Sequence, residues 1–156
     1  MVNPGWSLEK MVRAALESVG FETFKWRDWK KKRDSLGDEI LLQNSPLSHV
    51  IEVKGRTEFL VKSKRLGFDV RIECKNQSSP GSAWEKLPYA YYRLAKFAEE
   101  PLCLLIHGGG NPQHRMMCDW LKNNDELSGW IEGEEREILI LGIEEFTDWV
   151  YHSFRK

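Results

Sequence analysis

Hydrophobic and polar residues alternate most regularly between Phe68 and Gln77. The apolar positions are Phe68, Val70, Ile72 and Cys74, and the polar positions are Asp69, Arg71, Glu73, Lys75 and Gln77. Because successive side chains of a strand point to opposite faces, this pattern predicts a strand with one face in the core. The other face would carry a line of carboxylates, cations and an amide, which is more densely charged than an ordinary solvated strand face.

Helix-like and strand-like patterns follow one another along the rest of the chain. Apolar residues at helical spacing predict helices over residues 8–19, 82–100, 115–123 and 146–154. Shorter apolar or alternating runs predict strands over residues 21–26, 49–54, 57–62, 68–75, 102–106 and 137–141. Residues 63–67 are predicted to form a hairpin turn, and the basic, then irregular residues 27–47 a loop or lid. Ser82 and Glu85 fit a capping box, although Pro88 would move the start of that helix several residues later. The pattern predicts an α/β sandwich around a central mixed sheet flanked by helices.

Composition narrows the class of protein. With 156 residues, of which 41% are hydrophobic, the chain can bury a sizeable core, so we expect one domain over residues 1–156. Its apolar runs are too short to span a bilayer and its start does not resemble a signal peptide, so a cytoplasmic protein without a membrane partner is expected. The cysteines, Cys74, Cys103 and Cys118, lie in apolar patterns and are predicted to be reduced core thiols, not a disulfide or zinc framework. The histidines, His49, His107, His114 and His152, show no ligand spacing and are expected to be structural or solvated.

Charge is distributed unevenly along the chain. Residues 1–77 contain 15 Lys and Arg against 11 Asp and Glu, whereas residues 78–156 contain 8 against 13. The positive excess is concentrated between Lys25 and Arg33, where cations alternate with aromatic residues. Such a segment can contact a polyanion through phosphate pairing and base stacking, although a solvated basic loop gives the same pattern. The candidate nucleic-acid contacts are Trp29, Lys30, Lys31, Lys32 and Arg33.

Glu73 and Lys75 lie on one strand face, and a second acid is needed for a metal site. Asp69 shares their face, but it lies four residues from Glu73, roughly 13 Å along an extended strand. Magnesium–oxygen bonds are only about 2.0–2.1 Å long, so Asp69 and Glu73 cannot easily share one ion. A turn centred near residues 65–66 would place Glu58 directly opposite Glu73, at a spacing of about 4.5–5.5 Å. We therefore favour Glu58 as the partner of Glu73 and keep Asp69 as the alternative.

A second Glu-x-Lys segment occurs at Glu52-Val-Lys54, with Asp38 as a distant acid. Another strand is predicted directly after Lys54, whereas a polar loop, a helix and a buried strand follow Lys75. This order of elements favours Glu73 and Lys75, and the earlier segment is kept as a minor alternative.

The segment around Glu73-Cys-Lys75, preceded by Glu58 and followed by Gln77, resembles the PD-(D/E)XK nuclease superfamily, which has the restriction-endonuclease-like fold. The resemblance covers roughly residues 7–124 and implies an αβββαβ core with the first acid on the second core strand. Residues 81–89 and 106–110 are similar to a group of these nucleases found in phages and mobile elements. The chain departs from the family pattern in having no Pro-Asp dipeptide and a glutamate where aspartate is usual.

The resemblance implies a metal-dependent endonuclease that hydrolyses DNA with Mg²⁺, or with Mn²⁺ in its place. It implies that Glu58 and Glu73 bind the metal, with Glu9 on the first helix as a lesser candidate. Lys75 would position or deprotonate the attacking water, and Gln77 would orient water or phosphate. Lys86 is a further candidate contact to the nucleic acid. RNA remains open as a substrate and a homodimer as the assembly, because many relatives cut two strands. The alternatives are a non-catalytic binding module on the same fold, a nuclease toxin acting on RNA, and a charged face that is merely solvated.

Overall fold

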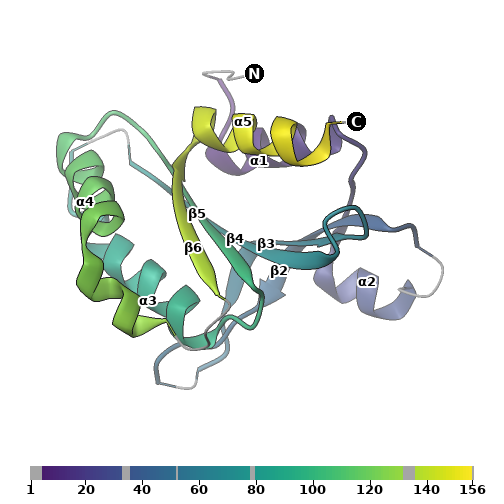
Figure 1. The fold of residues 1–156 in the computed structure, drawn as a ribbon, viewed down its shortest axis with the longest axis horizontal. Helices are drawn as coiled ribbons and strands as arrows, with labels where there is room; N and C mark the ends of the chain where they lie inside the picture. The colour runs from purple at the N-terminus through teal and green to yellow at the C-terminus, as the bar shows by residue number, and fades with distance from the viewer. Residues whose placement is uncertain (1–4, 33–35, 52, 78–79, 132–135, 156) are drawn as a thin grey trace.

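The computed structural model describes residues 5–32, 36–51, 53–77, 80–131 and 136–155. At its centre is a six-stranded sheet with the strands in sequence order from one edge to the other (Figure 1). The strands are β1 (Glu22–Lys25), β2 (Glu39–Pro46), β3 (Arg56–Ser63), β4 (Phe68–Asn76), β5 (Leu102–Gly108) and β6 (Glu137–Gly142). The central strands β2, β3 and β4 form an antiparallel meander, while β1, β5 and β6 each pair in parallel with their neighbour. The predicted mixed sheet is therefore confirmed.

Helices cover both faces of this sheet. The helices α1 (Leu8–Glu17) and α5 (Ile143–Phe154) lie side by side on one face (Figure 1). The other face carries α2 (Trp26–Lys32), α3 (Leu87–Phe97) and α4 (Pro112–Asn123), together with the 3-10 helices η2 (Ala83–Lys86) and η3 (Asp125–Trp130). The order α1, β2, β3, β4, α3, β5 reproduces the expected αβββαβ core.

The alternation predicted for residues 68–77 is present in β4 and corresponds to the two helical layers. Val70, Ile72 and Cys74 of β4 are buried against α1 and α5, where Leu8, Val12 and Leu16 project at helical spacing from α1. The polar residues of β4 therefore face the layer of α2 and α3. This side of the sheet is where a cleft can form, because α2 covers the β1–β3 end and α3 the β5–β6 end.

Two predicted elements are wrong, and both lie before β3. Residues 27–47 were expected to be a loop or lid, but the structure has α2 and β2 there. In β2 the consecutive residues Ile40, Leu41 and Leu42 are all buried, because helices cover both faces, so this strand lacks an alternating pattern. Residues 49–54 were expected to be a strand, but the described residues form a turn whose Val50, Ile51 and Val53 are exposed.

The later elements agree more closely with the sequence. The strands at 102–106 and 137–141, the helix at 115–123 and the turn after Ser63 are all observed, with shifts of a few residues at their ends. Pro88 does delay its helix, which begins at Leu87 after the 3-10 turn. The predicted capping box is not formed, because the Ser82 side chain makes no cap hydrogen bond.

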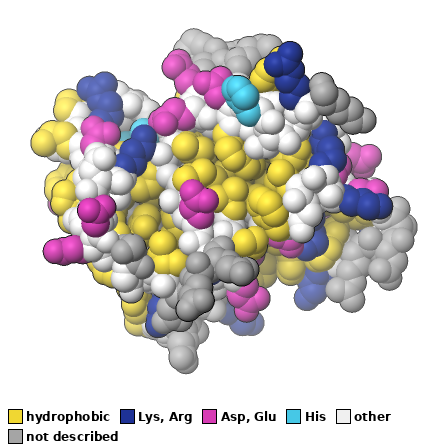
Figure 2. All heavy atoms as spheres, viewed as in Figure 1, with side chains coloured by type: hydrophobic (Ala, Val, Ile, Leu, Met, Phe, Trp, Pro, Cys, Tyr) yellow, Lys and Arg dark blue, Asp and Glu magenta, His cyan; other side chains and the backbone are white. Residues whose placement is uncertain are grey.

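The edge strand β6 is only partly covered. Its residues are mostly half-buried, and hydrophobic side chains gather over this part of the molecule between α5 and the α3–α4 pair (Figure 2). Within the described ranges, no helix combines the length and the apolar character needed to cross a membrane.

Candidate active site

The β3–β4 hairpin has the register expected from the sequence. Phe59 pairs with Ile72 and Lys62 with Asp69, so the next pair along the hairpin is Glu58 with Glu73. Glu58 is held from the other strand, because its Oε2 accepts a hydrogen bond of 3.2 Å from the backbone N–H of Cys74. The two glutamates therefore lie side by side at the end of the antiparallel pairing.

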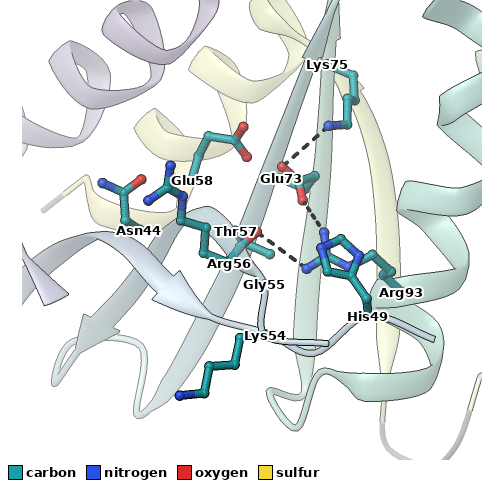
Figure 3. A pocket seen from close by; sticks show the side chains of 10 residues that line it. All are labelled: Asn44, His49, Lys54, Gly55, Arg56, Thr57, Glu58, Glu73, Lys75 and Arg93. Atoms are coloured by element: carbon teal, nitrogen blue, oxygen red, sulfur yellow. Dashed lines mark hydrogen bonds and ion pairs between the residues drawn. The ribbon is translucent and has the colours of Figure 1, made fainter. Parts of the chain in front are cut away.

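A cleft of about 620 Å³ opens above these two acids (Figure 3). Strands β3 and β4 contribute Glu58, Glu73 and Lys75, while α3 contributes Arg93. The remaining lining residues come from the end of β2, the loop that follows it and the start of β3: Asn44, His49, Lys54, Gly55, Arg56 and Thr57. The structure thus brings three predicted site residues, Glu58, Glu73 and Lys75, into one cavity.

Glu73 is the most buried acid of the cleft, with 3% of its surface exposed. Burial, and after it the adjacent Glu58, raise the pKa of Glu73 to about 9 against the smaller opposing effects of Lys75 and Arg93. Lys75 Nζ lies 3.9 Å from Glu73 Oε1, and Arg93 Nη1 lies 3.5 Å from Oε2. Two neighbouring carboxylates in such a site are stable together only with a proton or a cation between them.

Arg93 is a buried member of the site that sequence reasoning missed. Its guanidinium donates to the carbonyl oxygens of Leu47 (2.8 Å), Ser48 (3.3 Å) and Arg56 (3.4 Å), as well as approaching Glu73. It therefore joins α3, the β2–β3 loop and the acid on β4. The available signal was a charged residue on the apolar stripe of α3, next to Ala90 and Leu94.

The β2–β3 loop forms the outer wall of the cleft. His49 stacks on Tyr89 of α3 and shares a 2.8 Å hydrogen bond with its hydroxyl. Asn44 has a φ of 58°. It lies opposite Glu58, because the flanking pairs of β2 and β3 are Gln43 with Phe59 and Ser45 with Thr57. Asparagine tolerates this left-handed conformation better than most residues, which explains its presence inside a strand. The exposed cations Lys54 and Arg56 complete this wall.

A second buried charge network lies beside the cleft. Arg71 donates to Glu100 Oε1 through Nε at 2.9 Å and Nη2 at 2.5 Å. Its Nη1 donates to the Ser45 and Thr57 hydroxyls and to the carbonyl of Pro46. The network ties β4 to β2 and β3 and reaches the cleft at Thr57, and the bond to Arg71 lowers the pKa of Glu100 despite burial.

Other predicted residues lie outside the cleft. Asp69 forms a 2.6 Å ion pair with Lys62, farther along the hairpin. Gln77 is buried and its Nε2 donates to the carbonyl of Gly81 at 2.9 Å, which joins the residue after β4 to the segment before η2. Glu9 is in the first turn of α1. The pKa of the Cys74 thiol is raised mainly by burial, then by the charge of Glu58 and then by that of Glu9.

The fold separates Asp38 from Lys54, two residues of the alternative Glu-x-Lys site. Asp38 lies 3.7 Å from Lys64 near the hairpin turn, whereas Lys54 lines the cleft. Glu52 lies outside the described residues.

The predicted nucleic-acid contacts divide into two groups. Trp29 packs on Ile40, Leu42 and Leu60, and its ring lies 5.1 Å from that of Trp26 at a tilt of 36°, so it serves mainly to fasten α2 to the sheet. The cations Lys30, Lys31 and Lys32 are exposed along α2, and Lys86 is exposed at the end of η2. Arg33 lies outside the described residues.

The two acids suit a hard divalent cation. Their oxygens are the ligand type that Mg²⁺ prefers, and their buried proximity is relieved when a cation replaces the shared proton. The residues present therefore fit the metal that the sequence resemblance implies.

Comparison with known families agrees with this arrangement. The fold and the paired acids with a neighbouring lysine define an α/β domain of the restriction-endonuclease-like type. The family model of the PD-(D/E)XK nuclease superfamily domain matches residues 3–154. The chain belongs to the PD-(D/E)XK nuclease superfamily, whose nucleases generally use divalent metal ions. No curated protein and no solved structure matches the chain.

Proposed function

We propose that the protein is a Mg²⁺-dependent endonuclease that hydrolyses phosphodiester bonds of DNA. The observation that carries the proposal is the convergence of Glu58, Glu73 and Lys75 in one cleft. The chain that contains this cleft belongs to a nuclease superfamily. A solvated strand face would not need a glutamate with 3% exposure beside a second carboxylate.

Each residue of the cleft has a separate task in this proposal. Glu58 and Glu73 would hold the divalent ion, which when bound polarises the phosphate and lowers the pKa of a bound water. Lys75 is partly exposed at the mouth of the cleft, and its ammonium would offset charge on the phosphate or hold the attacking water. Arg93 acts through Glu73, because its bonds to the loop carbonyls fix the position of that carboxylate. Gln77 would support the loop beside the site.

Substrate contacts follow from the exposed cations. Lys54 and Arg56 stand at the cleft itself, and Lys30–Lys32 on α2 extend the positive surface on the same side of the sheet. We propose that phosphates of the substrate follow these cations. By analogy with the family pattern, cleavage would leave a 5′-phosphate and a 3′-hydroxyl. A homodimer, an origin in phages or mobile elements, and a cytoplasmic location remain predictions.

The test is a cleavage assay with three substrates, namely plasmid DNA, single-stranded DNA and RNA, each with Mg²⁺, with Mn²⁺ or with chelator. The wild type should cleave DNA only when the ion is present. Glu73→Gln and Lys75→Met should each lose roughly 10²–10⁴-fold in rate, the range expected when a positioned catalytic group is removed.

Asp69→Asn is the matched control, since this acid lies on the same strand but outside the cleft. It should retain activity, whereas Glu58→Gln should not. Cleavage that persists in Glu73→Gln and Lys75→Met would refute the proposed site. A folded wild type that binds DNA but cleaves none of the three substrates would instead establish the non-catalytic binding module, and cleavage of RNA alone would establish the RNA nuclease.

A further inference from the structure

A cluster of three potential metal ligands lies near the acids, where α4 packs on the end of β5. His107 is near the end of β5, while His114 and Cys118 are one turn apart on α4. One ligand atom from each residue lies within 4.8 Å of the other two. Among the described residues, this is the one group of three His, Cys, Asp or Glu side chains with such a spacing. The sequence reads His-x₆-His-x₃-Cys, a spacing that becomes a cluster only when α4 folds back over the sheet.

Two of the three residues are fully buried, and ring nitrogens of both histidines lack hydrogen-bond partners of ordinary geometry. His114 and Cys118 are each 1% exposed. Among the described residues, Nε2 of His107 and both ring nitrogens of His114 have no hydrogen-bond partner of ordinary geometry. Buried polar groups in native proteins are nearly always satisfied, so imidazole nitrogens that lack a well-formed hydrogen bond next to a buried thiol require an explanation. Ordinary core packing does not supply one.

We propose that His107, His114 and Cys118 form a binding site for a transition-metal ion of borderline softness, with Zn²⁺ as the ion best matched. Two imidazole nitrogens and one thiolate are a typical zinc ligand set, and three protein ligands leave a fourth position for water. The Zn–N and Zn–S bonds are about 2.0–2.1 Å and 2.3 Å, so tetrahedral ligands lie roughly 3.3–3.6 Å apart. Side-chain shifts on the order of 1 Å would close the observed spacing onto an ion.

The surroundings provide the support that metal-binding histidines usually have. The His114 ring lies beside the backbone of Lys75, an approach that raises its pKa less than burial lowers it. An imidazole that ligates a metal through one nitrogen commonly donates its other N–H to a backbone carbonyl. Burial also lowers the pKa of His107, so both rings favour the neutral form that binds metals. The side chain of Asn111 caps α4 by accepting from the N–H of His114 at 3.1 Å, which fixes the turn that carries this ligand.

This site differs in chemistry from the paired acids. Nitrogen and sulfur ligands select zinc-like ions, whereas the two glutamates select hard ions such as Mg²⁺. The two places are nonetheless neighbours, since Lys75 of β4 pairs with His107 of β5. A bound ion would fasten the start of α4 to β5 beside the strand that carries Glu73 and Lys75. The inference does not depend on nuclease activity.

The experiment is a titration of metal-free protein with Co²⁺, which serves as a spectroscopic substitute for Zn²⁺. We expect one Co²⁺ per chain, with a thiolate-to-cobalt charge-transfer band and displacement of the ion by Zn²⁺. Zn²⁺ should also raise the Tm of the wild type, a readout that needs no variant. Cys118→Ser should abolish the charge-transfer band. Loss of a residue that only supports a metal ligand typically costs roughly 10–100-fold in affinity, so loss of the Cys118 ligand itself should weaken binding at least as much.

Two control variants separate this site from other sources of binding. Cys103 is also buried and lies on β5, but it is not part of the cluster, so Cys103→Ser should retain the band. Glu73→Gln should also retain it, because the acids belong to the other site. If Cys118→Ser does not fold, His107→Gln tests the same ligand set from a partly exposed position. A wild type without the band, or equal binding by wild type and the cluster variants, would overturn the proposal.

Discussion

Replacing Glu73 by glutamine should stabilise the metal-free protein at high pH. The pKa of Glu73 is raised from 4.5 to about 9, mainly by burial and then by Glu58. Its folded form therefore binds a proton that the unfolded chain has released, and the unfavourable contribution grows as pH rises from 4.5 toward 9. Glutamine has nearly the same shape and no charge, so it removes this contribution while filling the same space.

The size of the effect follows from the proton difference. Each pH unit within this window costs up to about 1.36 kcal/mol, so the ceiling between about pH 5 and pH 8 is roughly 4 kcal/mol. The pKa of about 9 already includes the opposing effects of Lys75 and Arg93. We therefore expect the stability advantage of Glu73→Gln over the wild type to grow by roughly 2–4 kcal/mol between about pH 5 and pH 8, or by about 4–16 °C in Tm.

Thermal or urea unfolding in chelator, measured at several pH values, tests this expectation. Glu100 provides a control, because it is also a buried acid, with 9% of its surface exposed, but its pKa is lowered by Arg71. Its stabilising contribution is present above its ordinary pKa and is lost as pH falls through the lowered value. Glu100→Gln should therefore destabilise the protein at neutral pH, by about 3–5 kcal/mol, because Arg71 would lose its buried partner.

The two variants thus have opposite predicted signs. A pH-independent difference between wild type and Glu73→Gln, or a Glu73→Gln protein that is less stable at pH 8, would refute the electrostatic reasoning. Adding Mg²⁺ should narrow the difference, since a cation between the two acids stabilises the wild type alone.

Three further predictions concern the cleft and its surroundings. Lys75→Met should leave the Tm nearly unchanged, as its side chain is about one-third exposed, while cleavage falls roughly 10²–10⁴-fold. Replacing Lys30–Lys32 by alanine should weaken DNA binding and lower the slope of log K against log[salt] by up to about 2.7, measured by fluorescence anisotropy in Ca²⁺; an unchanged slope would exclude α2 from the interface. Gly55→Ala should destabilise the protein by about 1–3 kcal/mol, because its Cβ would lie 2.6 Å from the ring of His49. Gly37→Ala, where the added Cβ meets nothing within 4 Å, is the control for urea unfolding.

The hairpin that carries the two acids could be predicted because its information is local. A turn after Ser63 and strict alternation in β4 define which residues face one another, and Glu58 and Glu73 follow from the register. The same local information distinguished Asp69, whose distance along the strand separates it from Glu73. Fold class was also accessible, since element order and hydrophobic periodicity suffice for it.

Residues brought together by tertiary packing could not be predicted in the same way. The β2 strand was missed because burial on both faces removes alternation, and the exposed Val50, Ile51 and Val53 imitated a strand. Arg93 enters the site only through the docking of α3 on the β2–β3 loop. His107, His114 and Cys118 meet through the packing of α4 on the sheet, which no short spacing rule represents.

The contacts of Arg93 make completion of the cleft depend on the docking of α3. The guanidinium reaches the loop carbonyls and Glu73 together, so the loop and the acid acquire their positions only when α3 docks. A chain that has formed only the β2–β4 meander would have its acids in register but would lack Arg93 beside Glu73 and a fixed outer wall. If the protein cleaves nucleic acid as proposed, such partly folded molecules would be poor catalysts.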